Sequence, residues 1–141
     1  AMGLVQLKRA DEMLEGRRNI ARRFKAAVDQ LDALEYLDIH DFDAHAWHLF
    51  VVRLRPGALD IDRAAFIEAL KERGVGASVH FIPLHMHPYY RETYGYKPAD
   101  LPVARACYER SLSLPIYSKM TNTQVDRVVE AVADICAAHR R

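Results

Sequence analysis

The stretch WHLFVVRL, residues 47–54, is dense in aromatic and β-branched side chains. This composition favours a β-strand, and the lack of strict alternation between apolar and polar residues indicates apolar surroundings on both of its faces. Pro56 and Gly57 supply turn residues directly after it. We therefore expect an interior strand at the centre of the fold.

Amphipathic helices are predicted on both sides of this strand. Apolar residues recur at steps of three and four over residues 4–34, which predicts one long helix or a kinked pair. Gly16 is the expected weak point, because a glycine inside a helix costs about 1 kcal/mol relative to alanine. Asp62 is expected to cap a second helix that ends at Gly74. A capping-box motif opens a further helix with a continuous apolar stripe over residues 121–136.

Two more strands are predicted to complete the sheet. Apolar and polar residues alternate over residues 75–81, and a short apolar run follows at residues 112–114. Short helices are expected at residues 89–94 and 102–109, each with a proline near its start. The order of elements predicts an α/β fold, a small sheet of about three strands packed with helices.

Length and composition exclude several classes of protein. The chain has 141 residues, half of them hydrophobic, and a net charge of +1. These values predict one domain over residues 1–141 and no nucleic-acid partner, because no broad positive field is available to attract phosphates. No segment reaches bilayer length and no signal peptide is present, so we expect no membrane partner. Two cysteines in helical segments fit a cytoplasmic protein.

The N-terminal residues favour a fragment of a longer protein. Ala1 precedes Met2, as a cleaved expression tag can leave it, and a helical pattern begins at once without a cap. We therefore leave Ala1 out of the fold predictions. The alternative is a natural start.

Histidines are the most prominent candidates for chemistry. There are seven, and those in or beside the expected strands and the loop between residues 82 and 88 are His45, His48, His80, His85 and His87. Imidazole is a common ligand of zinc, but no HExxH or CxxC motif and no carboxylate at ligand spacing accompanies them. We expect no metal, with a histidine-cluster metalloprotein as the alternative.

Four segments in order resemble the C-terminal small domain of the DegT/DnrJ/EryC1/StrS family of pyridoxal-phosphate-dependent sugar aminotransferases. They are GLVQLKRADEMLEGRRNIARRF (3–24), HAWHLFVVRL (45–54), ERGVGASVHFIPLHMHPYYRETYGYKP (72–98) and LSLPIYSKMTNTQVDRVVEAV (112–132). The resemblance is greatest to members that aminate a keto group on a nucleotide-linked sugar. It implies the small-domain fold of fold-type I aminotransferases, with glutamate as amino donor and cell-surface polysaccharide biosynthesis as the setting.

The resemblance also implies that this chain does not catalyse the transfer alone. In the family a large N-terminal domain carries the lysine that binds pyridoxal phosphate, and residues 1–34 here match the helix region between the two domains. Every lysine lies within or directly beside a segment that matches the small domain: Lys8, Lys25, Lys71, Lys97 and Lys119. We expect no catalytic residue in this chain and no pyridoxal phosphate bound to it.

In the family the small domain borders the substrate pocket. The matching loop contains His80, Pro83, Leu84, His85, Pro88 and Tyr89. We expect His80, His85 and Tyr89 to contact the nucleotide-sugar substrate. A plainer interpretation is that His85 only holds the loop by a hydrogen bond to the backbone.

Two further expectations follow. A helix that bridges two domains exposes its apolar stripe when the second domain is missing, so residues 4–14 are predicted to mediate self-association or to fray. The alternative function is a free-standing, non-catalytic α/β module that binds a ligand or a protein, because folds of this kind host many functions.

Overall fold

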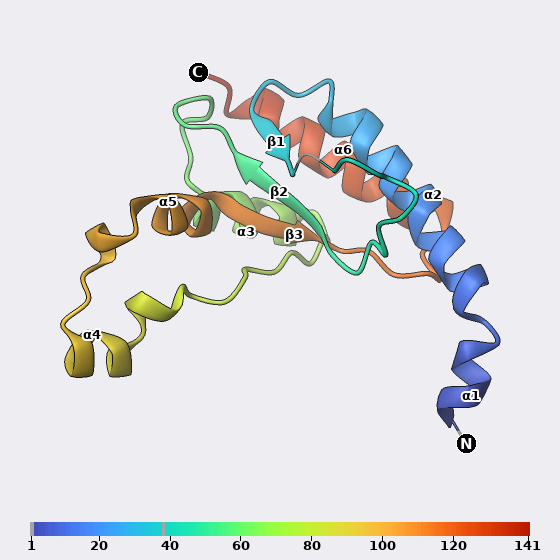
Figure 1. Ribbon diagram of the computed structural model, residues 1–141. Coiled ribbons are helices and arrows are strands. Elements are labelled where there is room, and N and C mark those ends of the chain that lie inside the picture. Colours follow the sequence, from blue (N-terminus) through green and yellow to red (C-terminus); the bar gives the residue numbers. More distant parts are fainter. Residues whose placement is uncertain (1, 38) are drawn as a thin grey trace.

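A three-stranded antiparallel sheet lies at the centre of the structure (Figure 1). It consists of β1 (Leu34–Tyr36), β2 (Phe50–Leu54) and β3 (Ser111–Leu114), in the order β1-β2-β3. The computed structural model describes residues 2–37 and 39–141, so Ala1 lies outside the described residues. The predicted α/β fold with a small sheet of about three strands is confirmed.

The central strand is shorter and more one-sided than predicted. Trp47 precedes β2 and has a φ of 48°, which takes it out of the extended conformation. Along β2, burial alternates, with Phe50, Val52 and Leu54 buried and the two residues between them half-buried. The predicted interior position is confirmed, since β2 is the middle strand, but apolar surroundings on both faces are not found, because every second side chain points away from the core.

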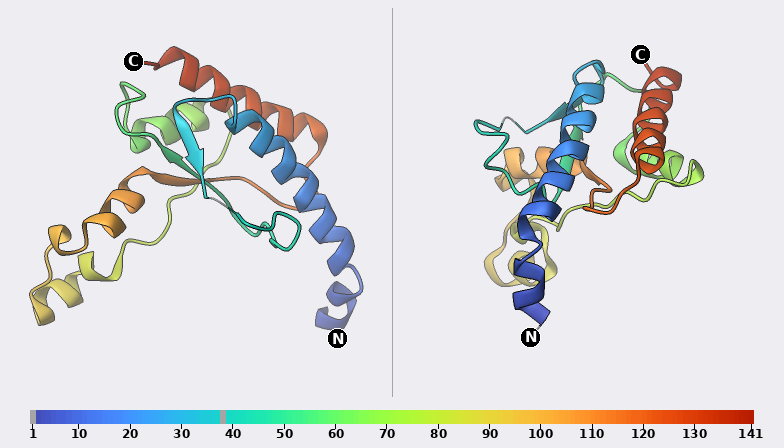
Figure 2. Two further views of the ribbon diagram at one scale, coloured as in Figure 1. Left: turned by 45° about the horizontal axis from the view of Figure 1, so that its top comes forward. Right: turned by 90° about the vertical axis from the view of Figure 1, so that its right-hand side faces the viewer.

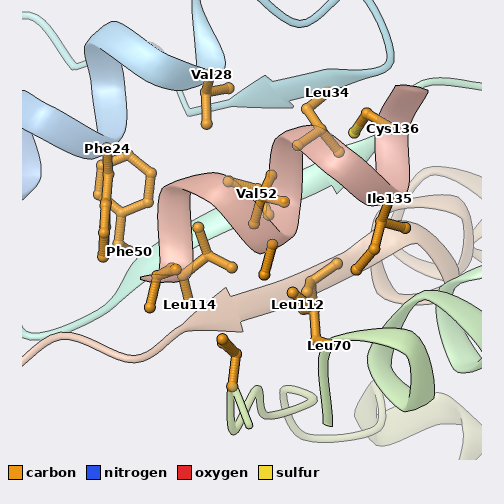
Figure 3. Packing of buried hydrophobic residues seen from close by; sticks show 14 of the residues in the cluster. Phe24, Val28, Leu34, Phe50, Val52, Leu70, Leu112, Leu114, Ile135 and Cys136 are labelled. Atoms are coloured by element: carbon orange, nitrogen blue, oxygen red, sulfur yellow. The ribbon is translucent and has the colours of Figure 1, made fainter. Parts of the chain in front are cut away.

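Three helices cover the core face of the sheet: α2 (Ala10–Val28), α3 (Arg63–Glu72) and α6 (Asn122–Ala138). Figure 2 shows α2 and α6 running side by side over the sheet, and α6 also contacts α3. Figure 3 shows where side chains from these helices meet those of all three strands, including Phe24, Val28, Leu34, Phe50, Val52, Leu70, Leu112, Leu114, Ile135 and Cys136. This layer is the hydrophobic core.

The predicted helix ends of α3 and α6 are confirmed. The Asp62 carboxylate accepts a hydrogen bond from the backbone N–H of Ala65 at 2.9 Å and so caps α3. Gly74 follows this helix with a φ of 73°. At α6, Thr121 and Gln124 form the predicted capping box.

The N-terminal segment is a kinked pair of helices, but the break is not where it was predicted. α1 (Met2–Leu7) ends before Arg9, and Gly16 lies inside the continuous helix α2. A Cβ atom at Gly16 would lie 3.1 Å from the carbonyl oxygen of Ser118. Glycine stands here because the helix passes close to the loop after β3, a tertiary contact that helical periodicity does not reveal.

The predicted strand over residues 75–81 is wrong. This segment makes one isolated bridge to the sheet, between Ser78 and Ser113. Beyond the bridge the chain leaves the sheet, and Phe81 is 97% exposed. The third strand is β1, which lies partly inside the predicted N-terminal helix, because α2 already ends at Val28.

The short helices α4 (Pro88–Tyr94) and α5 (Pro102–Arg110) agree with the predictions. Two 3₁₀ helices were not predicted: η1 (Leu84–Met86), which lies in the segment expected to be a loop, and η2 (Pro98–Asp100). The cysteines lie in helices, as expected, and burial raises the pKa of the Cys136 thiol to about 11. Among the described residues, no helix combines the length and the apolar character that crossing a bilayer requires.

The close approach at Gly16 predicts a size limit at this position. We expect Gly16→Val to lower the free energy of unfolding by about 1–3 kcal/mol, because the side chain must displace the loop backbone at Ser118. Urea denaturation followed by circular dichroism measures this change. Gly3→Val is the matched control, since nothing lies within 4 Å of a Cβ atom at Gly3. Equal stability of the two variants would contradict the prediction.

Candidate functional site

The segment over residues 79–101, which we call the arm, contains most of the loop singled out in the sequence. It carries η1, α4 and η2 and projects away from the sheet before the chain returns in α5 (Figure 1). Many of its large apolar side chains are exposed: Val79, Phe81, Ile82, Leu84, Tyr89, Tyr94, Tyr96 and Leu101. Such a concentration of exposed apolar residues in one segment is typical of a surface that meets a ligand or another part of a protein.

The arm is attached to the edge of the sheet at β3. The backbone N–H of Ser78 donates to the Ser113 carbonyl at 3.2 Å, and the N–H of Ser113 donates to the Ser78 carbonyl at 2.8 Å. Two residues further on, His80 Nε2 lies 2.7 Å from Ser113 Oγ. His80 is therefore a half-buried residue with a fixed ring, at the point where the arm leaves the sheet.

His85 lies in η1 and is only 4% exposed. Its Nε2 atom is buried and has no hydrogen-bond partner among the described residues. A buried polar atom without a partner costs about 1–3 kcal/mol, so this nitrogen is able to accept or donate one more hydrogen bond. The neighbouring His87 makes the bond to the backbone, with Nε2 3.0 Å from the carbonyl oxygen of Ile82. The backbone contact that holds the loop is therefore made by His87 and not by Nε2 of His85.

Tyr89 lies in α4 and is 62% exposed. Its ring packs edge-on against Tyr90 at a centroid distance of 5.4 Å, and Tyr90 stacks on Tyr94 at 6.0 Å. These rings form an aromatic cluster on the arm.

The best-defined surface hollows of the described residues lie away from the three candidates. Five such hollows have volumes of about 200 to 540 Å³, and none of these five is lined by His80, His85 or Tyr89. The three candidates follow one another along an open arm.

The described residues include no group of three or more His, Cys, Asp or Glu side chains able to hold a metal ion. His45 has a structural contact instead. Its Nδ1 atom accepts a hydrogen bond from the Trp47 N–H at 3.0 Å, and its ring packs against the indole with a centroid distance of 4.4 Å.

The lysines do not fit the binding of pyridoxal phosphate. A lysine that binds this cofactor covalently must lose its charge readily, which requires a desolvated or electropositive environment. Lys25 is half-buried, but its Nζ donates to the Asp29 carboxylate at 2.7 Å, and this hydrogen bond raises the pKa of the ammonium group. The other four lysines are exposed.

An ion cluster that the sequence did not indicate attaches the far end of the arm. Arg53 Nε and Arg110 Nη1 each lie 3.2 Å from the same carboxylate oxygen of Glu35. Arg110 also donates to the carbonyl of Leu54 at 3.1 Å. Because Arg110 ends α5, this cluster fixes the segment that follows the arm to the face of the sheet opposite the core.

The fold matches one part of solved aminotransferase structures. The structure matches the aminotransferase TlmJ from Streptoalloteichus hindustanus with a TM-score of 0.82 and 28% identity, covering 96% of this chain and 35% of that chain. It matches the putative sugar aminotransferase Spr1654 from Streptococcus pneumoniae with a TM-score of 0.84 and 26% identity, covering 96% of this chain and 34% of that chain.

The family is established by sequence. The family model described as the DegT/DnrJ/EryC1/StrS aminotransferase family matches residues 1–133, and the chain belongs to this family. It is 48% identical over 136 residues to the spore coat polysaccharide biosynthesis protein SpsC of Bacillus subtilis, which covers 96% of this chain. The chain spans about a third of the length of this curated relative. The resemblance found in the sequence is confirmed.

Proposed function

We propose that residues 1–141 form the C-terminal small domain of a cytoplasmic pyridoxal-phosphate-dependent aminotransferase. Its reaction is the transfer of an amino group, from glutamate, to a keto group of a nucleotide-linked sugar. The observation that carries this proposal is the family match over residues 1–133, in a chain that spans about a third of its relative. The name of the Bacillus subtilis relative refers to polysaccharide biosynthesis, which supports a sugar substrate.

In this proposal the cofactor and the catalytic lysine come from the part of the enzyme outside this chain. The surface position of the lysines supports this division, because none of them is buried. Residues 1–34 then serve as the helix region between the two domains. Figure 1 shows α1 and α4 both below the sheet, at its opposite sides, so a second domain seated there could meet both. Such a domain would cover the exposed apolar side chains of the arm, which argues against a free-standing module.

We assign the arm to one wall of the substrate pocket. The ring nitrogens of His80 and His85 and the hydroxyl of Tyr89 can form hydrogen bonds with sugar hydroxyls or phosphate oxygens. His80 and Tyr89 are accessible as they stand. His85 is covered, and its unpartnered Nε2 supports a role in which η1 moves when substrate binds.

The pocket assignment predicts a selective effect of histidine substitutions in the full-length enzyme. We expect His80→Ala and His85→Ala each to lower kcat/KM for the keto-sugar by about 10- to 100-fold, the loss of one or two hydrogen bonds. The visible absorption of the bound cofactor should not change. His40→Ala, an exposed histidine outside the arm, is the control. Unchanged kcat/KM in both the His80→Ala and the His85→Ala variant would show that the arm does not line the substrate pocket.

Because the proposed cofactor site and catalytic lysine lie outside this chain, we predict that the isolated chain is inactive. We expect no visible absorption from a lysine-bound cofactor after incubation with pyridoxal phosphate and gel filtration, and no amination of a keto-sugar with glutamate. Absorption spectroscopy and a coupled assay of the glutamate product measure both. A coloured, active preparation would overturn the proposal that this chain is not catalytic alone.

The isolated chain is also expected to self-associate through α1. The side chains of Met2, Leu4, Val5 and Leu7 are 59 to 85% exposed. We expect a concentration-dependent rise in mass in sedimentation velocity, and its loss in Leu4→Glu. Gln6→Glu adds the same charge at a polar position of α1 and should still associate. A chain that stays monomeric at every concentration would contradict this prediction.

A further inference from the structure

We propose that Ser113 is a positioning residue that fixes both the orientation of the His80 ring and the nitrogen that carries its proton. The consequence for substrate binding rests on the proposed function, because it takes His80 as a pocket residue. The positioning itself is a property of this chain alone and can be measured without substrate.

The backbone brings the two side chains together. Ser78 and Ser113 face each other across the isolated bridge, with hydrogen bonds in both directions. His80 lies two residues beyond Ser78 and is therefore the diagonal neighbour of Ser113 on the same side of this pair. The imidazole ring of His80 contacts β3, where its Nε2 atom lies 2.7 Å from Ser113 Oγ.

Burial decides the direction of this hydrogen bond. Ser113 is only 3% exposed, and His80 Nε2 is the one partner that the described residues give to its hydroxyl. If Nε2 carried a proton and donated it, the hydroxyl hydrogen of Ser113 would be buried without an acceptor, which is the costly arrangement. The hydroxyl of Ser113 therefore donates, and Nε2 accepts.

The neutral His80 ring then carries its proton on Nδ1, because the bond made by one nitrogen sets the state of the other. The nitrogen turned away from Ser113 is thus an N–H donor. It is suited to oxygen acceptors, such as a sugar hydroxyl or a phosphate oxygen, and not to donor groups. Ser113 in this way makes His80 selective for the kind of atom that a nucleotide-linked sugar presents.

The chain offers a matched control on the same strand. Ser111 is two residues earlier in β3, is similarly buried, and donates its hydroxyl to the carbonyl of Cys107 at 2.6 Å. Ser111→Ala therefore removes a comparable buried hydroxyl without removing the contact to His80.

The test is to determine the His80 tautomer in the ¹⁵N-labelled chain by long-range ¹H–¹⁵N correlation spectra at about pH 8, where imidazoles are neutral. His80→Gln assigns the signals. We expect an unprotonated Nε2 and a protonated Nδ1 in the unsubstituted chain, in Ser111→Ala and in Ser113→Thr. In Ser113→Ala we expect the proton to move to Nε2 in a large share of the molecules.

A protonated Nε2 in the unsubstituted chain would overturn the proposal, as would an unchanged tautomer in Ser113→Ala. If Ser113→Ala does not fold, the unsubstituted chain and Ser113→Thr still decide, because both must show the Nδ1-protonated ring. In the full-length enzyme, Ser113→Ala should raise KM for the keto-sugar several-fold and have no further effect in a His80→Ala background. If only this kinetic experiment fails and the tautomer is as expected, the result would count against the pocket role of His80 and not against its positioning by Ser113.

Discussion

A sheet of three strands, none longer than five residues, holds together only because helices cover one of its faces. The side chains of Phe24, Val52 and Leu112 are almost fully buried in this layer, although they come from three different parts of the chain. Because burial alternates along β2, the side chains on one side of this strand pack into the core. The other side is left for polar contacts, and these contacts determine where the rest of the molecule attaches.

The arm depends on that polar side and on the free edge of β3. At its start, the bridge between Ser78 and Ser113 holds the backbone. At its end, α5 is held by Arg110, which shares the carboxylate of Glu35 with Arg53. The arm is thus a long segment with two fixed ends, and the residues between them can carry exposed apolar side chains without loosening the sheet. This arrangement suits a surface that is completed by another part of a larger enzyme.

Features that depend on neighbouring residues could be predicted from the sequence, and features that depend on distant ones could not. The caps at Asp62 and Thr121 were found because a capping bond spans three residues. The predicted strand at residues 75–81 was wrong because alternation shows how a chain could pair and not whether it stays beside the sheet, and only Ser78 pairs with β3. Gly16 by itself indicates a helix break, because the contact that explains this glycine, with Ser118, is 102 residues away in the sequence. At the site, His80 and His85 stood out from the motif, whereas Ser113, 33 residues from His80, had no local signal.

The backbone at Trp47 has a spectroscopic consequence. This residue is the only tryptophan in the chain, and it is 2% exposed beside β2. Its indole Nε1–H donates to the carbonyl of Phe42 at 3.1 Å, and its left-handed φ turns the ring against Phe50. Intrinsic fluorescence of this protein therefore reports on the junction between the β1–β2 loop and the core. The arm carries four of the seven tyrosines and no tryptophan, so the tryptophan signal does not report directly on the arm.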